Sequence, residues 1–295
     1  GRPADRPRRR VGLALAATAT AYLRRVGLAL GGLAALVASA NTNKMSGPWE
    51  TGETAAKILD KPTWPQTFPL TKEHLSRIDE SPDTQFYSQP RVNVQHIDEA
   101  AVATLGDFYK KAMPPESVIL DLMSSWTSHL AKGAGQDKAD GYYKRVSAVG
   151  MHDSELAANP ALHDYHVHDL NAKPHLKMYG DNTFDVVFCS VSVDYLADPL
   201  PIFREVWRVL RPHGLAIFTW SNRMFPTKAI KAWREASEPG RLWICGAYFH
   251  YSVPNGWAGP HAHDLSPNPG RSDPVYAVSA RKMDPNRLID PDREL

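Results

Sequence analysis

The sequence predicts an α/β fold, a mostly parallel twisted sheet with helices on both faces. Patterns with helical spacing separate several short apolar runs of strand length, and this alternation is typical of βαβ units. The runs are residues 117–121, 146–151, 165–167, 184–190, 215–220 and 275–280. Such sheets bind ligands beyond the carboxyl ends of their strands, so we expect one rim to gather the polar residues there. These are Asp121, His152, Asp169 and residues 190–194.

The first run ends at an acidic residue and a turn of small residues. Segment 117–126 reads SVILDLMSSW, with Asp121 at the expected strand end and Ser124 and Ser125 at the bend into a first helix. Dinucleotide folds place glycines at this bend, because glycine reaches positive φ without strain and lets a pyrophosphate touch the backbone. Hydroxyls and an indole stand here instead, which favours a cofactor without phosphates, such as S-adenosylmethionine.

The clearest helix is expected after the run 184–190. Ile202, Phe203, Val206, Val209 and Leu210 repeat at helical spacing, so one apolar stripe packs on the sheet. Residues 211–214 (RPHG) end this helix, since proline disfavours helical geometry in the residue before it and glycine suits the exit. The next strand is expected from residue 215.

Three segments resemble the class I S-adenosylmethionine-dependent methyltransferases, particularly the type 11 domain. They are VILD at 118–121, FDVVFCS at 184–190 and FREVWRVLRPHG at 203–214, of which the last is the most specific. The resemblance covers roughly residues 86–282 and implies a Rossmann-like class I methyltransferase fold. A narrower resemblance joins the chain to uncharacterised bacterial and plastid methyltransferase-like proteins, in which DLMSSW replaces the glycine-rich turn. Segments 86–91, 96–98, 155–160, 221–223 and 225–230 match the rest of that pattern.

The family resemblance implies the cofactor site. It puts Asp121 near the amino-acid end of S-adenosylmethionine, the 123–126 turn beneath the carboxylate and sulfonium, and Asp169 near the adenine amine. Arg91 is expected to clamp the methionyl carboxylate as a bidentate donor. The expected cofactor-binding residues are Arg91, Asp121, Met123, Ser124, Ser125, His152, Asp153, Asp169, Leu170 and Ser190.

The end of the second run departs from the family pattern. The family commonly has an acidic residue there for the ribose hydroxyls, whereas this chain has His152 followed by Asp153. Either His152 accepts one hydroxyl bond or Asp153 substitutes. Because a neutral imidazole accepts one such bond and a carboxylate two, we expect micromolar affinity or weaker.

Methyl transfer requires little side-chain chemistry, because the sulfonium is already activated and orientation with desolvation supplies most of the acceleration. A general base is needed only when the acceptor must lose a proton. Asn222 and Arg223 are expected to orient a polar or acidic acceptor. The candidate bases are Tyr87, His96, Asp194 and Tyr195.

Several of these residues also have a purely structural interpretation. Asp121 could cap the following helix, and Trp126 is expected in the core. His96 is equally suited to a cap or bridge. Arg223 and Lys228 could form a solvated basic edge.

The histidines do not predict a metal site. His163, His166 and His168 would share one face of a strand, but no cysteine or carboxylate pair completes a tetrahedral zinc site. His261 and His263 lie in a stretch rich in proline, glycine and aspartate, which predicts a loop.

Composition limits the remaining possibilities. The 295 residues are 43% apolar and suffice for one large core. A net charge of +2 predicts no nucleic-acid partner. Cys189 and Cys245 do not make a disulfide framework. Prolines from residue 254 onward indicate an irregular C-terminal section of the 86–295 domain that could fold over the rim or meet a partner.

Residues 1–40 have the pattern of a targeting segment. A basic stretch, Arg24 and Arg25, and an apolar run ending in small residues match an export signal of the twin-arginine kind. We expect a bipartite plastid (chloroplast) transit peptide leading to the thylakoid lumen. The alternatives are a mitochondrial or stromal presequence, or an uncleaved membrane anchor.

Residues 41–85 are polar and proline-rich and predict an extended arm. Trp49 and Trp64 are expected to dock on the parent domain or on another subunit. A helix is expected over residues 98–113, with Ala101, Leu105 and Phe108 on the face that covers the sheet edge or the cofactor.

Two functions fit the sequence. The first is a plastid methyltransferase acting on a small-molecule acceptor. The second is a non-catalytic subunit or assembly factor of a thylakoid or other organellar membrane complex, since fold does not fix function. The lumen, where we do not expect the methyl donor, favours the second, and the stroma favours the first.

Overall fold

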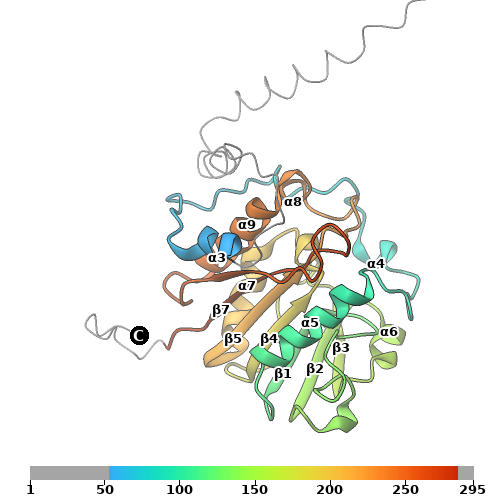
Figure 1. Ribbon diagram of the computed structural model, residues 1–295. Helices are drawn as coiled ribbons and strands as arrows, with labels where there is room; N and C mark the ends of the chain where they lie inside the picture. Colours follow the sequence, from blue (N-terminus) through green and yellow to red (C-terminus); the bar gives the residue numbers. More distant parts are fainter. Residues whose placement is uncertain (1–52, 285–295) are drawn as a thin grey trace, which may run out of the picture. The chain divides into compact units, whose positions relative to one another are not determined.

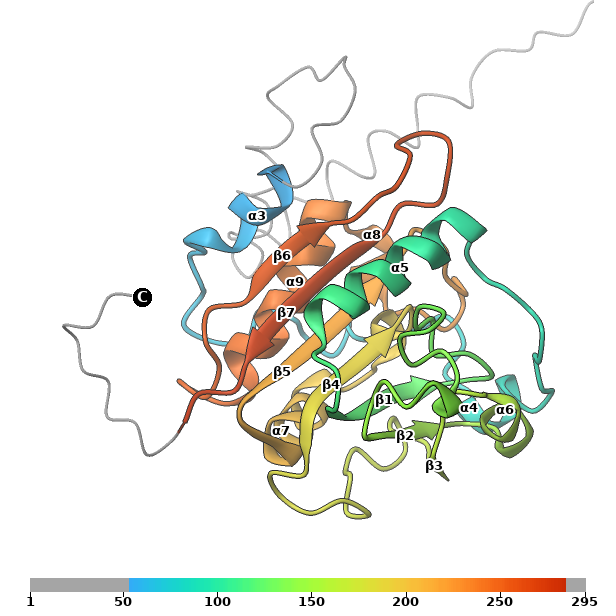
Figure 2. The ribbon, with the colours of Figure 1, turned by 60° about the horizontal axis from the view of Figure 1, so that its bottom comes forward.

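The computed structural model describes residues 53–284, which belong to the compact unit Met45–Leu295. The predicted targeting segment 1–40 lies outside the described residues. A seven-stranded sheet runs in the order β3-β2-β1-β4-β5-β7-β6 (Figures 1 and 2). The strands are β1 (Val118–Ser124), β2 (Arg145–Gly150), β3 (Asp164–Val167), β4 (Phe184–Ser190), β5 (Leu210–Trp220), β6 (His261–Asp264) and β7 (Tyr276–Arg281).

The sheet is mostly parallel, which confirms the predicted fold class. The pairs β1–β2, β1–β4, β2–β3 and β4–β5 are parallel, whereas β7 pairs antiparallel with both β5 and β6. The prediction of a loop at His261 and His263 was wrong. Both residues lie in β6, where backbone pairing with β7 overrides the weak local strand propensity around them.

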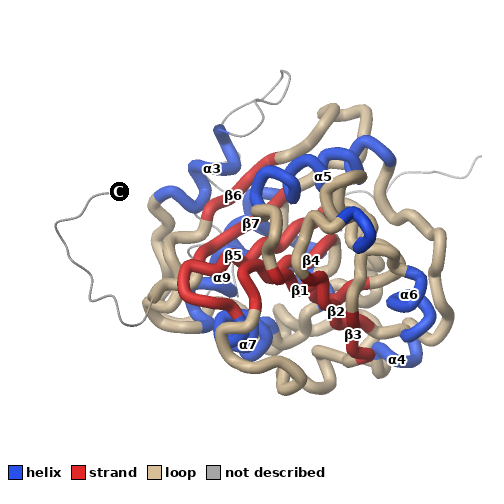
Figure 3. Tube along the Cα trace, turned by 90° about the horizontal axis from the view of Figure 1, so that it is seen from below, coloured by secondary structure: helices blue, strands red, loops and turns tan. Residues whose placement is uncertain are grey.

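Helices cover both faces of the sheet (Figure 3). They are α3 (Glu53–Asp60), α4 (Asp83–Phe86), α5 (Glu99–Ala112), α6 (Asp153–Ala158), α7 (Pro199–Val209), α8 (Lys231–Glu235) and α9 (Glu238–Ser252). Side-chain alternation along β5 divides the core. Ile217 belongs to the cluster under α5, whereas Phe218 stacks on Phe203 of α7 at 4.3 Å between ring centroids. None of the helices within residues 53–284 combines the length and apolarity needed to cross a membrane.

Two predicted helices are confirmed. The apolar stripe of α7 is fully buried, and the helix ends at Val209. Strand β5 begins at Leu210, earlier than residue 215, but its pairing with β4 shifts register between Phe184 and Val186. Helix α5 has Asp98 as its N-cap, because the Asp98 carboxylate accepts from the Ala101 backbone N–H.

The predicted arm is partly helical, since α3 lies within it. Trp64 packs on the parent domain, with ring centroids 5.2 Å from Trp243 and 4.9 Å from His250 of α9. Trp49 lies outside the described residues. The loop 78–97 takes in the end of the arm and the short helix α4, leads into α5 and runs beside the carboxyl ends of the strands.

The segment after β1 differs from the prediction. The strand does not stop at Asp121 but continues to Ser124. Residues 125–144, all of which the structure describes, contain no α-helix before β2 begins. A single 3-10 turn, η1 (Lys138–Asp140), stands there instead. Left-handed residues at His129 (φ 55°), Gly133 (φ 67°) and Gly135 (φ 93°) interrupt the chain repeatedly, which is incompatible with a helix.

Gly150 sits where β1 and β2 come unusually close. Met123 is an extra residue in β1, so that Ser124 pairs with Gly150 immediately after Leu122 pairs with Val149. A Cβ atom on Gly150 would lie 2.3 Å from the Ser124 carbonyl oxygen and 2.9 Å from the Leu156 Cδ2. Only glycine permits this approach without a backbone shift.

We therefore expect Gly150→Ala to lower the free energy of unfolding by about 1–3 kcal/mol, the usual cost of overpacking. Chemical denaturation of the purified protein measures it. Gly259→Ala is the matched control, because a Cβ atom on Gly259 would have no neighbouring atom within 4 Å. Equal stability of the two variants would contradict a close β1–β2 approach.

Candidate functional site

A cavity of about 310 Å³ opens at the carboxyl ends of β1, β2 and β4. From β1 the chain first adds β2 and β3 on one side of the sheet and then returns to add β4 on the other side. This switch in strand order leaves a crevice between the loops that follow β1 and β4. The loop 87–97 and residues 223–225 form the opposite wall. The predicted residues that line the cavity are Tyr87, Arg91, His96, Asp121, Met123, Ser124, Ser125, Asp169, Leu170, Ser190, Tyr195 and Arg223.

Asp121 and the hydroxyl groups of Ser124 and Ser190 form the floor. The Asp121 side chain is 1% exposed, and its Oδ2 accepts from the Ser124 Oγ at 2.6 Å. Burial raises the pKa of this carboxyl to about 7. Beside it, the buried Tyr109 hydroxyl is bonded to the Ser190 Oγ at 2.7 Å and to the Thr219 Oγ1 at 2.9 Å. Asp121 caps no helix, because none follows β1.

Three cavity residues have strained backbones, one of which is His129 with φ 55°. Met123 has φ 59° and the β-branched Val191 has φ 45°, where glycine would be unstrained. Met123 lies within β1 one residue before its end at Ser124, Val191 directly follows the end of β4, and both line the cavity. Strain of this kind costs about 1–3 kcal/mol and concentrates at functional sites. The turn therefore adopts a glycine-like conformation without the glycines.

Aromatic side chains surround Arg91 on the opposite wall. Its guanidinium carbon lies 4.8 Å from the Tyr87 ring centroid, 4.9 Å from that of Phe225 and 5.2 Å from that of Phe86. The Arg91 backbone N–H donates to Glu155 Oε1 at 2.6 Å. Glu155 Oε2 accepts from the Ser125 Oγ at 2.7 Å, so this carboxylate ties the loop 87–97 to the turn after β1.

Past the end of β3 the chain makes a turn built on Asp169. Its Oδ1 accepts from the backbone N–H groups of Asn171 at 2.9 Å and Ala172 at 3.0 Å. Leu170 is buried and Asn171 is half-buried, and residues 169–171 of this turn all face the cavity.

Four predicted site residues do not line the cavity. His152 precedes α6, and its Nδ1 lies 3.0 Å from the Ser154 Oγ. Asp153 accepts from the Tyr165 hydroxyl at 3.2 Å. Asn222 is exposed, and its Oδ1 accepts from the Ser221 Oγ. Asp194 is buried behind the wall. The predicted convergence on one rim thus fails for His152 and Asp194, because the chain turns away from the cavity at both.

Sequence reasoning missed several lining residues. Trp126 was expected in the core, but it is half-buried, lines the cavity and donates from Nε1 to the Val94 carbonyl at 3.1 Å. Glu155 carried no local signal beyond belonging to the matching segment 155–160. His129 reaches the wall through the irregular loop after β1. The missed lining residues include Trp126, His129, Gly150, Met151, Glu155 and His168, whereas Asn171, expected beside Asp169 and Leu170 near the adenine, does line the cavity.

Among the four candidate bases, His96 is the best suited. Burial and the nearby Arg91 cation lower the pKa of His96, so its imidazole is neutral and able to accept a proton near pH 7. Burial raises the pKa of Tyr87 and of Tyr195, which keeps both hydroxyls protonated. The Tyr195 hydroxyl also accepts from the Phe225 backbone N–H at 2.9 Å.

The histidines near β3 have ordinary structural partners. The His163 Nδ1 accepts from the Val146 backbone N–H at 3.1 Å, the His166 ring contacts Tyr179, and the His168 Nε2 lies 2.8 Å from the Lys173 carbonyl. Residues 53–284 contain no group of three His, Cys, Asp or Glu side chains placed to hold a metal ion.

The strand order and the position of the cavity define a class I methyltransferase fold. A family model described as a methyltransferase domain matches residues 132–218. This match supports S-adenosylmethionine as the cofactor, as the sequence implied.

Two curated relatives match shorter stretches of the chain. The probable methyltransferase ltbC of Aspergillus luteorubrus is 34% identical over 94 residues, which is 30% of this chain and 29% of that protein. The malonyl-[acyl-carrier protein] O-methyltransferase of Marinomonas sp. (strain MWYL1) is 32% identical over 53 residues, 18% of this chain and 20% of that protein. The alignments thus span less than a third of either relative.

Solved structures with a similar arrangement are more distant in sequence. An S-adenosylmethionine-dependent methyltransferase from Mesorhizobium loti is 19% identical, with a TM-score of 0.40, 59% of this chain covered and 95% of the other. A second such protein, described as putative, from Listeria monocytogenes is 15% identical with a TM-score of 0.44, and the match covers 63% and 100% of the two chains.

The buried carboxyl group of Asp194, next to the site, should make the free energy of unfolding depend on pH. It is 3% exposed, and its Oδ2 finds no hydrogen-bond partner among the described residues. Burial raises the pKa of this carboxyl to about 7, although the Arg241 guanidinium opposes the rise. Between the unfolded value near 4 and about 7, folding takes up a proton, so the wild type loses stability as pH rises through this window.

We expect Asp194→Asn to remove this loss. The variant should gain about 1–3 kcal/mol relative to the wild type between pH 4 and pH 7.5, since one pKa unit corresponds to about 1.4 kcal/mol. Urea unfolding at several pH values measures the difference. Exposed Asp107→Asn on α5 is the control. A stability difference independent of pH would contradict the raised pKa.

Proposed function

We propose that the protein is an S-adenosylmethionine-dependent methyltransferase acting on a small-molecule acceptor. The observation that carries the proposal is the cavity between the ends of β1 and β4, floored by buried Asp121 and Ser124 and bounded by strained Met123 and Val191. The strain and the buried carboxylate have no evident structural benefit, and both are typical of ligand sites.

The residues around the cavity suit the two ends of the cofactor. The turn at Asp169 and Leu170 would meet the nucleoside, since Asp169 Oδ1 is committed to the turn and leaves Oδ2 for a ligand. Asp121 and the 123–125 turn would meet the amino-acid end, with Arg91 as the cationic group on the facing wall. Of the acidic residues in α6, Glu155 and not Asp153 faces the cavity. Both Glu155 oxygens already accept hydrogen bonds, which is consistent with weak ribose binding.

The proposed mechanism rests on position and desolvation. The bound sulfonium supplies the activated methyl group. The aromatic wall of Tyr87, Phe225 and Tyr195 excludes water and aligns the acceptor for in-line attack. Neutral His96 accepts the proton of an acidic acceptor group, and Arg223 lies at the edge to orient a polar or anionic substituent.

Calorimetric titration tests the cofactor site. We expect the wild type to bind S-adenosylmethionine and S-adenosylhomocysteine with micromolar dissociation constants or weaker. Asp121→Ala should abolish the heat, whereas His96→Gln should keep it and lose turnover by about 10²–10⁴-fold with acceptors found by screening, the usual share of a general base.

Asp107→Ala serves as the binding control, because Asp107 is exposed on α5 and outside the cavity. Absence of heat at millimolar ligand would contradict the enzymatic proposal. It would leave a non-catalytic protein with a methyltransferase fold, serving a membrane complex.

We also propose a plastid location. The stroma suits the proposed methyltransferase, whereas transport into the thylakoid lumen by the twin-arginine pair Arg24 and Arg25 would favour the non-catalytic alternative, because we do not expect the methyl donor there. The proposal is supported by the sequence pattern of residues 1–40 alone. A fluorescent fusion of the full chain in plant cells should label the chloroplast stroma, and Arg24→Lys with Arg25→Lys should leave this label unchanged. A lumenal label that the double variant shifts to the stroma would favour the non-catalytic alternative. Mitochondrial labelling would contradict the proposal.

A further inference from the structure

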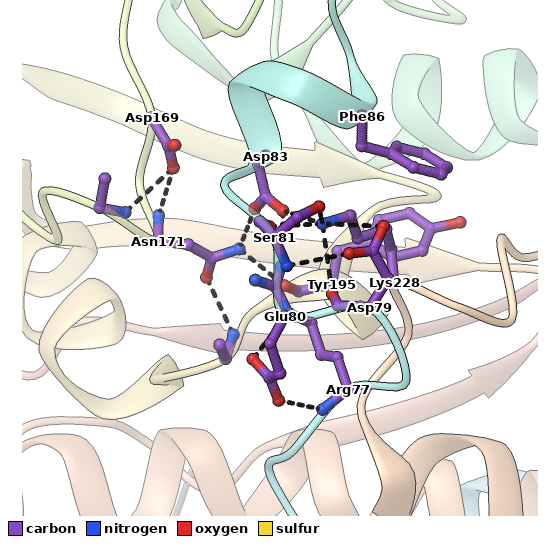
Figure 4. A network of polar contacts seen from close by, with 12 residues as sticks. Arg77, Asp79, Glu80, Ser81, Asp83, Phe86, Asp169, Asn171, Tyr195 and Lys228 are labelled. Atoms are coloured by element: carbon purple, nitrogen blue, oxygen red, sulfur yellow. Dashed lines mark hydrogen bonds and ion pairs between the residues drawn. The ribbon is translucent and has the colours of Figure 1, made fainter.

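A buried lysine joins three parts of the chain at the edge of the cavity (Figure 4). Lys228, between β5 and α8, is 0% exposed, so the expectation of a solvated basic edge there was wrong. Its Nζ donates to the Ser81 carbonyl at 2.7 Å and to the Asp79 carbonyl at 3.2 Å. The same Nζ lies 3.2 Å from Asp83 Oδ1 and 3.5 Å from Asp79 Oδ2.

Asp83 links Lys228 to the cavity wall, because it contacts the lysine and itself lines the cavity. It is 5% exposed, lines the cavity and accepts from Arg77 at its Oδ1 at 2.7 Å. Its Oδ2 accepts from the Asn171 Nδ2 at 2.7 Å. Both carboxylate oxygens of Asp83 are therefore held, one by cations and one by the amide of the Asp169 turn.

Asn171 has every side-chain group satisfied. Nδ2 also donates to the Tyr195 carbonyl at 2.9 Å, and Oδ1 accepts from the Ala197 N–H at 2.9 Å. Its side-chain bonds fix the position of Asn171, and its backbone N–H donates to Asp169. The position of Asn171 therefore also fixes the conformation of the Asp169 turn that faces the cavity. Figure 4 shows the unbroken path from Lys228 through Asp83 to Asn171 and Asp169.

Stability alone does not explain such a network. A buried ion pair is often no more stable than apolar residues of the same volume, because desolvation offsets the attraction. What the network does provide is a single arrangement of the loop 78–97, the turn after β3 and the segment after β5. Each of these contributes a wall to the cavity.

We propose that Lys228 is a positioning residue for the nucleoside end of the cofactor site and acts through Asp83 and Asn171 on the Asp169 turn. The inference rests on the proposed function. It assigns the end of the arm, with Asp79, Ser81 and Asp83, to the site itself, although this segment precedes the first strand in sequence.

The test measures S-adenosylhomocysteine binding by the full chain. Lys228→Met should weaken binding about tenfold, a change of about 1.4 kcal/mol. Lys231→Met is the matched control, because Lys231 pairs with Glu73 at 2.5 Å and so also joins the arm to the segment after β5, but it does not line the cavity. We expect that variant to bind within twofold of the wild type.

Two readouts separate positioning from general loosening. Lys228→Met should reduce the preference for S-adenosylhomocysteine over its deaminated analogue S-inosylhomocysteine, whereas loosening elsewhere would weaken both ligands equally. In a double-mutant cycle with Asn171→Ala, the double variant should bind no more weakly than the weaker single variant, because both act on one turn.

Each outcome decides the inference. Additive effects in the cycle, or an unchanged preference, would overturn it. Asp83→Asn replaces Lys228→Met if the latter does not fold, with the same expected losses. No binding by the wild type would overturn this inference and the proposed function together, whereas normal binding by the wild type and all variants would overturn this inference alone.

Discussion

The site depends on the close approach of β1 and β2 at their carboxyl ends. The extra residue Met123 pushes the Ser124 carbonyl against Gly150, where any side chain would collide. This bulge turns the Ser124 hydroxyl toward buried Asp121 and opens the crevice beside β4. The turn after β1 contains no glycine, yet Met123 adopts a backbone conformation typical of glycine. This bend fits because Gly150 of the neighbouring strand has no side chain to collide with the Ser124 carbonyl.

The second constraint comes from outside the sheet. The loop 78–97 supplies Asp83, Tyr87, Arg91 and His96 to one cavity, and buried Lys228 from the segment after β5 holds it there. The cavity therefore has a polar floor built by strands and an aromatic, cationic wall built by loops. The floor and Arg91 suit the charged amino-acid end of the cofactor, the Asp169 turn suits its nucleoside, and the aromatic wall suits an acceptor that must be kept from water.

Much of the architecture was accessible from local patterns. The alternating runs, the buried stripe of α7 and the capped helix α5 each follow from side-chain periodicity, which packing on a sheet then satisfies. The same patterns failed at β6 and in the segment after β1. In β6 the strand exists because β7 offers backbone partners, and after β1 left-handed residues such as His129 replace the expected helix.

The sequence alone was enough to predict the fold class, the edge of the sheet that carries the site and the acidic residue at its floor, Asp121. These features depend on side-chain periodicity and on the order of strands along the chain, which are local or nearly local properties. Three-dimensional packing was needed to establish that Glu155 rather than His152 or Asp153 faces the cavity, and that Lys228 is buried rather than solvated. These outcomes depend on how distant segments meet, and charge pairs such as Lys228 with Asp83 leave no periodic trace in the chain.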